Sequence, residues 1–160
     1  MKTIEWLTIA SLTLTACSDP QTAVYEENPE LKAVIDQTES VSVFQVQTGD
    51  CLIGGLQDVQ VSDMDKIDCS KPHIYEVYFT FQLPVGPFPG DAAIEEQADN
   101  RCQAEFESFV GKSFEDSSLT FTRLTPNAEG WRLQKDREIV CMIQTMDDST
   151  LSQSAKGSAL

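Results

Sequence analysis

The stretch from Cys69 to Leu83 constrains the fold most, because it carries the clearest strand pattern in the chain. From Tyr75 onward the odd positions are apolar or aromatic, and polar residues take most of the even ones. A period of two, filled with residues that favour strands, predicts a strand with one buried and one solvated face. Pro72 suits the start of such a strand, where its missing N–H costs least. We therefore expect a central strand here, entered from His73, the only histidine of the chain.

Residues 1–16 predict an export signal. Lys2 precedes an apolar run from Trp6 to Ala16, which is too short to span a bilayer. The run ends in Leu14-Thr15-Ala16-Cys17, which resembles the lipobox of bacterial lipoproteins, in which the cysteine is acylated and becomes the first residue. We expect Cys17 to carry acyl chains such as palmitate, two or three of which anchor a protein durably to the membrane. A plain secretory signal that happens to end near a cysteine is the alternative.

The formal net charge of −15 limits the partners of the chain. Lys2 and Glu5 cancel, so removing the signal leaves the charge unchanged. Such a surface repels nucleic acid phosphates and anionic lipid headgroups, which excludes both as direct partners. We interpret the acidity chiefly as a means of keeping an exported protein soluble.

Composition divides the exported part into three segments. Residues 17–40 are polar and acidic and predict a flexible tether, with at most a marginal short helix at residues 29–37. Residues 41–147 carry the strand and helix patterns and form the expected domain. Residues 148–160 are small and polar, and we expect them to be a disordered tail.

One long helix is expected after the central strand. Asp91 is a suitable N-cap, Gly111 is a suitable stop, and apolar residues recur between them at spacings of three and four. This apolar stripe comprises Ile94, Ala98, Cys102, Phe106, Phe109 and Val110. The first strand of the domain is expected over residues 41–46 and 51–53 with a tight corner at Gly49, and residues 59–61 are a candidate short strand. Further strands are expected at 119–124 and 138–145, a charged loop at 62–68, and a turn or a single helical turn at 126–131. The pattern predicts an α+β fold: an antiparallel sheet of about four to five strands with one main helix packed on one face.

Four cysteines remain after Cys17, and an even number in an exported domain predicts two disulfides. The absence of a Cys-x-x-Cys unit and of a second histidine argues against zinc. Of the three possible pairings we favour Cys51 with Cys69 and Cys102 with Cys141. In that pairing Cys102 faces the sheet from the helix, and Cys141 lies on the alternating face of the last strand. Joining Cys51 to Cys141 is the second choice.

Several short motifs occur in a recognisable order. They are Gly49-Asp50-Cys51-Leu52, Cys69-Ser70-Lys71-Pro72-His73, Glu76-Val77-Tyr78, Phe88-Pro89-Gly90, Cys102, Trp131, Asp136-Arg137, Cys141 and Ser154-Ala155-Lys156-Gly157. The ordered set covers about residues 45–157 and resembles the septum formation family of bacterial envelope proteins. This resemblance implies an extracytoplasmic domain, secreted or membrane-anchored, associated with division septa and without established catalysis. We expect a lipid-anchored interaction or scaffold domain that needs no cofactor and contacts an envelope protein or the cell wall.

The residues selected as a candidate functional surface are His73, Glu76, Trp131, Asp136 and Arg137. Unless a bulge intervenes, His73 and Glu76 point to opposite faces of the strand. We expect a structural histidine, bonded to a backbone carbonyl or a carboxylate near Pro72. The alternative is a small envelope hydrolase or wall-binding enzyme in which His73 forms an acid/base couple with Asp136 or Glu138.

The other candidate residues favour structural roles as well. Arg137 is expected to form an ion pair with Asp136 or Glu76, and an anion site is the alternative. Trp131 is expected to cover the core, and a sugar-stacking platform is the alternative. The acidic run Asp63-Met64-Asp65 lacks the glycine and glutamate of a calcium loop, so we predict no metal site there.

Overall fold

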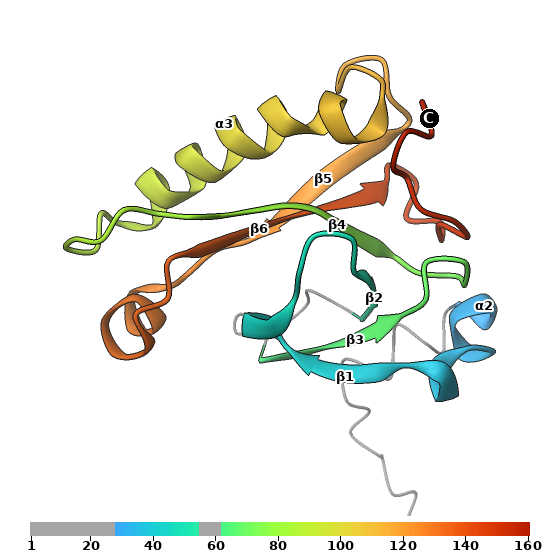
Figure 1. Ribbon diagram of the computed structural model, residues 1–160, viewed down its shortest axis with the longest axis horizontal. Coiled ribbons are helices and arrows are strands. Elements are labelled where there is room, and N and C mark those ends of the chain that lie inside the picture. Colours follow the sequence, from blue (N-terminus) through green and yellow to red (C-terminus); the bar gives the residue numbers. More distant parts are fainter. Residues whose placement is uncertain (1–27, 55–61) are drawn as a thin grey trace, which may run out of the picture.

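The computed structural model describes residues 28–54 and 62–160. There the chain forms a six-stranded antiparallel sheet in the order β1-β3-β2-β4-β6-β5, with the long helix α3 on one face (Figure 1). The elements are α2 (Pro29–Lys32), β1 (Glu39–Ser42), β2 (Cys51–Ile53), β3 (Asp63–Ile67), β4 (Tyr75–Gln82), α3 (Asp91–Val110), β5 (Leu119–Leu124) and β6 (Glu138–Thr145). The predicted α+β class is confirmed. The signal, Cys17 and the strand expected at 59–61 lie outside the described residues.

Strand β3 was not predicted from the sequence, because residues 62–68 were expected to form a charged loop. β3 pairs with β1 on one side and with β2 on the other. Only Met64 and Ile67 of this strand are buried, so its apolar pattern is too sparse to be recognised in the sequence. Its acidic residues therefore belong to a sheet and not to a cation-binding loop.

Strand β4 lies at the centre of the sheet and contains a β-bulge. Val77 pairs with Met142 of β6, but Phe79 pairs with Cys141, so Tyr78 is the extra residue. Before the bulge the even-numbered Glu76 shares a face with Ile143; after it, the odd-numbered residues face α3. The bulge therefore overturns the simple alternation that the sequence suggested, and both Glu76 and Tyr78 are buried.

Helix α3 and both disulfides agree with prediction. The residues buried along α3 are Ile94, Ala98, Cys102, Phe106 and Val110. Gly90, not Asp91, occupies the N-cap, and Gly111 ends the helix in the left-handed region with φ 84°. Cys51 is bonded to Cys69, and Cys102 to Cys141, with sequence separations of 18 and 39. The second bond ties α3 to β6 through the core.

The predictions of a flexible tether at residues 17–40 and a disordered tail at residues 148–160 are both wrong in part. Within the expected tether, Leu31 of α2 is fully buried against Cys51, Ile53 and Ile67. Within the expected tail, Leu151 and Ala155 are buried, and the backbone N–H groups of Gly157 and Ala159 donate to the last carbonyls of α3. The few apolar residues of each segment fill specific gaps, and the tail supplies donors that the helix end needs. Composition alone does not reveal either role.

No helix among residues 28–54 and 62–160 is long and apolar enough to cross a membrane. Figure 1 shows the C-terminal segment (red) near one end of the sheet and the turn at Gly130–Gln134 (orange) at the other. These two ends hold the residues selected from the sequence.

Candidate functional site

His73 lies at the end of the sheet near the C-terminal segment and is fully buried. Its backbone forms a two-hydrogen-bond bridge with Leu151, and its Nδ1 donates to the carbonyl of Lys71 at 2.7 Å. Its Nε2 is buried without a hydrogen-bond partner among the described residues. Burial lowers the pKa of His73, although the Lys71 carbonyl and the charge of Glu76 oppose this shift. The imidazole is therefore held neutral inside the protein.

Glu76 is buried close to His73 and binds the C-terminal segment directly. One carboxylate oxygen accepts from the hydroxyl of Ser154 at 2.5 Å, and the other accepts from the backbone N–H of Ala155 at 2.6 Å. A buried carboxylate with both oxygens accepting hydrogen bonds is well compensated for its lost hydration. Glu76 thus holds the end of the chain against the sheet.

The neighbourhood of Glu76 also contains the sulfur atoms of Cys51 and Cys69, all within 4.8 Å of one another and of a carboxylate oxygen. This group has the residue types of a metal site. The two sulfurs are bonded to each other, however, so neither offers the thiolate that a metal requires. The arrangement serves as a crosslink and not as a metal centre.

Trp131 and Arg137 lie at the opposite end of the sheet and pack on each other. Arg137 Cζ is 3.5 Å from the centroid of the Trp131 ring, and Arg137 Nη1 donates to the carbonyls of Trp131 and Asp136 at 2.8 and 2.6 Å. The indole N–H donates to the carbonyl of Gly86 at 2.9 Å. Arg137 forms no ion pair with Asp136 or Glu76 in the described structure, so that prediction is wrong; the guanidinium instead stacks and binds carbonyls.

The five selected residues do not form one surface. His73, Glu76 and Trp131 are buried, whereas Asp136 and Arg137 are only partly buried. The β4–β6 register places Gln82, nine residues after His73, opposite Glu138. At about 3.3 Å per strand residue, His73 lies more than roughly 20 Å from Asp136 and Glu138. The structure therefore does not bring together the acid/base couple of the hydrolase alternative.

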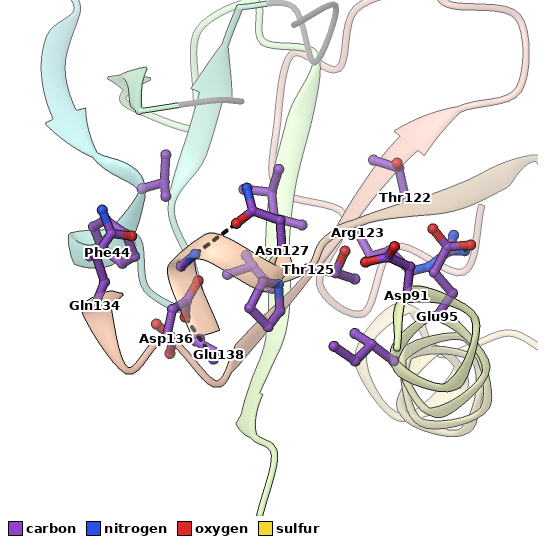
Figure 2. A pocket seen from close by; sticks show the side chains of 16 residues that line it. Phe44, Asp91, Glu95, Thr122, Arg123, Thr125, Asn127, Gln134, Asp136 and Glu138 are labelled. Carbon is purple, nitrogen blue, oxygen red and sulfur yellow. Dashed lines mark hydrogen bonds and ion pairs between the residues drawn. The ribbon is translucent and has the colours of Figure 1, made fainter. Parts of the chain in front are cut away.

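Asp136 and Glu138 instead line a groove of about 610 Å³ beside β5. Figure 2 shows these two carboxylates on one side, Asp91 and Glu95 of α3 on the other, and Thr125 between them. Asp136 accepts from the backbone N–H of Glu138 at 3.0 Å. Burial, followed by the nearby charge of Asp136, raises the pKa of Glu138, although a hydrogen bond from Gln82 opposes this.

Positive charge in the groove is already paired. The guanidinium of Arg123 binds Asp99 of α3 at 3.0 Å and Glu95 at 3.6 Å. Among the described residues, neither Asp136 nor Glu138 forms an ion pair. The groove thus carries unneutralised negative charge next to apolar lining from Phe44, Leu124 and Val140, and can hold a ligand that combines positive charge with apolar stems.

Sequence reasoning found Asp136 but missed the groove. The groove residues that it missed include Phe44, Asp91, Glu95, Thr125 and Gln134. They come from four separate regions of the chain, and only tertiary structure joins them. An acidic residue at positions 136 and 138 near a strand start was the one available signal.

Comparison with known proteins gives relatives by sequence but none by structure. The protein described as "Putative lipoprotein LppN" of Mycobacterium tuberculosis is 27% identical over 121 residues, which are 71% of this chain and 63% of that protein. A protein of Mycobacterium bovis with the same description matches to the same extent. The chain thus spans less than two thirds of the length of these relatives. No solved structure matches it significantly.

A family model described as Septum formation matches residues 48–160. The match includes both disulfides, the bulged strand β4, α3, the groove strands and the C-terminal segment that binds Glu76. It covers most of the chain and ends at its last residue. The chain therefore belongs to the Septum formation family.

Proposed function

We propose that the protein is a lipid-anchored, extracytoplasmic interaction domain of the bacterial cell envelope, acting without catalysis in septum or wall processes. Membership of the Septum formation family and the likeness to a protein described as a lipoprotein support an envelope-associated role. The anchor, the side of the membrane and the non-catalytic role are parts of this proposal.

The observation that carries the proposal is the use of the five cysteines. Four are consumed by two disulfides, and three of these four are fully buried. Such bonds form and persist in oxidising compartments outside the cytoplasm. The fifth, Cys17, is the one that directly follows Leu14-Thr15-Ala16. Four cysteines in disulfide bonds and one as the site of lipid attachment would account for all five.

The interaction role is supported by the contrast between the two candidate sites. His73 and Glu76 are buried, and His73 Nδ1 and both carboxylate oxygens of Glu76 form hydrogen bonds within the chain itself. The groove at Asp136 and Glu138 is open, and neither carboxylate forms an ion pair in the described structure. An open groove with a few polar groups is the usual form of a binding site.

Detergent phase partitioning of the protein made in a bacterial host tests the anchor. We expect the wild type in the detergent phase and Cys17→Ser in the aqueous phase, because acyl chains contribute about 0.8 kcal/mol per buried CH₂. Ser18→Ala is the matched control and should partition as the wild type does. Mass mapping without reduction should show acylated Cys17, Cys51 joined to Cys69 and Cys102 joined to Cys141.

An unmodified amino terminus together with four free thiols in protein recovered from the host would contradict the proposed compartment and anchor. Acylation with a different disulfide pairing would contradict the described fold alone, because the anchor does not depend on the pairing.

A further inference from the structure

We propose that the groove binds an extended, lysine- or arginine-rich segment of a partner protein, which adds to the open edge of β5. This inference rests on the proposed function and names the chemistry of the partner. Three features of the described residues support it: a free strand edge, unneutralised acidic groups beside it, and an apolar rim.

The strand edge is defined by the register of β5. β5 is the last strand of the sheet, and Met146 N donates to Ser118 O at 3.4 Å just before it begins. In an antiparallel pair the hydrogen-bonding residues alternate, so the backbone groups of Phe121 and Arg123 point away from β6. Neither backbone has a partner within the described parts of the chain. An extended peptide can complete this ladder with its own N–H and C=O groups.

The charges around this edge select a basic segment. Asp91 and Glu95 flank the end of β5 on one side, and Asp136 and Glu138 on the other (Figure 2). Arg123, the cation of the groove, is already engaged by Glu95 and Asp99. An incoming ammonium or guanidinium group would relieve the mutual repulsion of Asp136 and Glu138, whereas an anionic chain would be repelled.

The apolar rim suits the long stems of basic side chains. Phe44 is 53% exposed and lines the groove together with Gln134. Lysine and arginine place their methylene stems on such surfaces while their charged ends reach carboxylates. Because alternate residues of a strand point the same way, a segment with a basic residue at every second position presents its charges to one side.

A peptide titration tests the proposal with the acylated, disulfide-bonded protein in detergent micelles. The probe is a dye-labelled, capped Lys-Thr-Lys-Val-Lys-Thr peptide, and fluorescence anisotropy is the readout. A peptide with glutamate in place of lysine tests charge. A peptide N-methylated at alternate residues, which removes backbone donors, tests pairing with the strand edge.

We expect the lysine peptide to bind, and the double variant Asp136→Asn/Glu138→Gln to weaken binding about tenfold. The control Asp36→Asn/Glu96→Gln makes the same change of charge at exposed positions outside the groove, and should change affinity by less than about twofold. N-methylation should weaken binding as strongly as the groove variant does.

Equal losses in the groove and control variants would overturn the site, because they would show general charge attraction. Equal binding of the N-methylated peptide would overturn pairing with β5. If no basic peptide binds while Cys17 is acylated and the protein partitions into detergent, the partner chemistry is wrong and the proposed anchor stands.

Discussion

The two ends of the β4–β6 pair contain similar residues in opposite states. At one end, Glu76 is buried and both its oxygens accept hydrogen bonds from the C-terminal segment. At the other, Asp136 and Glu138 are half-buried beside an open groove, where Asp136 accepts one hydrogen bond from the backbone N–H of Glu138 and Glu138 accepts one from Gln82. Residue type therefore does not separate a structural carboxylate from a binding one. The number of partners that the fold supplies does.

We call the end of the β4–β6 pair at His73 and Glu76 the closed end, and the end at Asp136 and Glu138 the open end. The closed end depends on residues 151–160. Leu151 bridges the backbone of His73, Ala155 packs in the main core, and the segment then supplies donors to the end of α3. The open end has no equivalent segment among the described residues. There Trp131 and Arg137 pack on each other, and the groove beside β5 is open.

Removing residues 151–160 should have the largest effect on this comparison, because it opens the closed end. The deletion removes the burial of Leu151 and Ala155 and both hydrogen bonds that Glu76 accepts from the C-terminal segment. We expect a loss of at least about 4 kcal/mol in unfolding free energy, measured by urea denaturation. Gln153→Ala, an exposed change in the same segment, should cost little. An unchanged unfolding midpoint after the deletion would mean that the segment does not support the fold.

Glu76→Ala should lower the unfolding free energy by about 2–3 kcal/mol, because it leaves the N–H of Ala155 without an acceptor in the interior. Glu138→Ala at the open end removes a carboxylate that lacks a cation and should be close to neutral. Urea denaturation of both variants at neutral pH gives the comparison directly. Similar losses of unfolding free energy for the two variants would contradict the distinction between a buried carboxylate held by two donors and a half-buried one at the groove.

His73 should make the closed end sensitive to acid. Because burial lowers its pKa in the folded state, the stability from neutral His73 is present above its ordinary pKa near 6.5 and is lost as pH falls through the lower folded value. His73→Asn keeps a donor for the Lys71 carbonyl but does not titrate. We expect the wild type to lose more stability than this variant between pH 7.5 and 5. An NMR titration of this single histidine with a midpoint at or above 6.5 would refute the explanation.

Glu138→Gln should change the unfolding free energy least of these variants, and it should stabilise the protein where the others destabilise it. The raised pKa of Glu138 means that its charged form is disfavoured in the folded protein, so stability is greatest below its ordinary pKa near 4.5 and falls as pH rises through the folded value. Removing the charge should stabilise the fold at pH 7 by a few tenths of a kcal/mol. The gain should vanish at pH 4, and a loss at pH 7 would show that the carboxylate has a favourable partner.

The sequence predicted those parts of the fold that depend on local pattern. Helix α3 with its stop at Gly111, strands β5 and β6 and the favoured disulfide pairing follow from periodicity, the glycine at the helix end and the placement of Cys102 and Cys141. Strand β3 was missed because its apolar residues are few. The bulge at Tyr78 was missed because an inserted residue changes which face is buried without leaving a local signal.

The candidate site was less predictable because its contacts are distant in sequence. Glu76 meets Ser154 and Ala155 across 78 and 79 residues, and small polar residues at a chain end ordinarily indicate disorder. The groove joins the helix start, β5 and the residues before β6, which share no motif. Asp136 could be selected from the sequence, but its state could not, because that depends on which cations the fold places nearby.

Photo-cross-linking in living cells tests most directly whether the open end, and not the closed end, meets a partner. Thr125 in the groove and Gln153 beside the closed end would each be replaced by p-benzoylphenylalanine in the full chain. We predict a protein adduct from position 125 that is lost with Asp136→Asn/Glu138→Gln, and none from position 153. Adducts from position 153 alone, or an adduct from 125 that survives the groove variant, would contradict the assignment of the two ends.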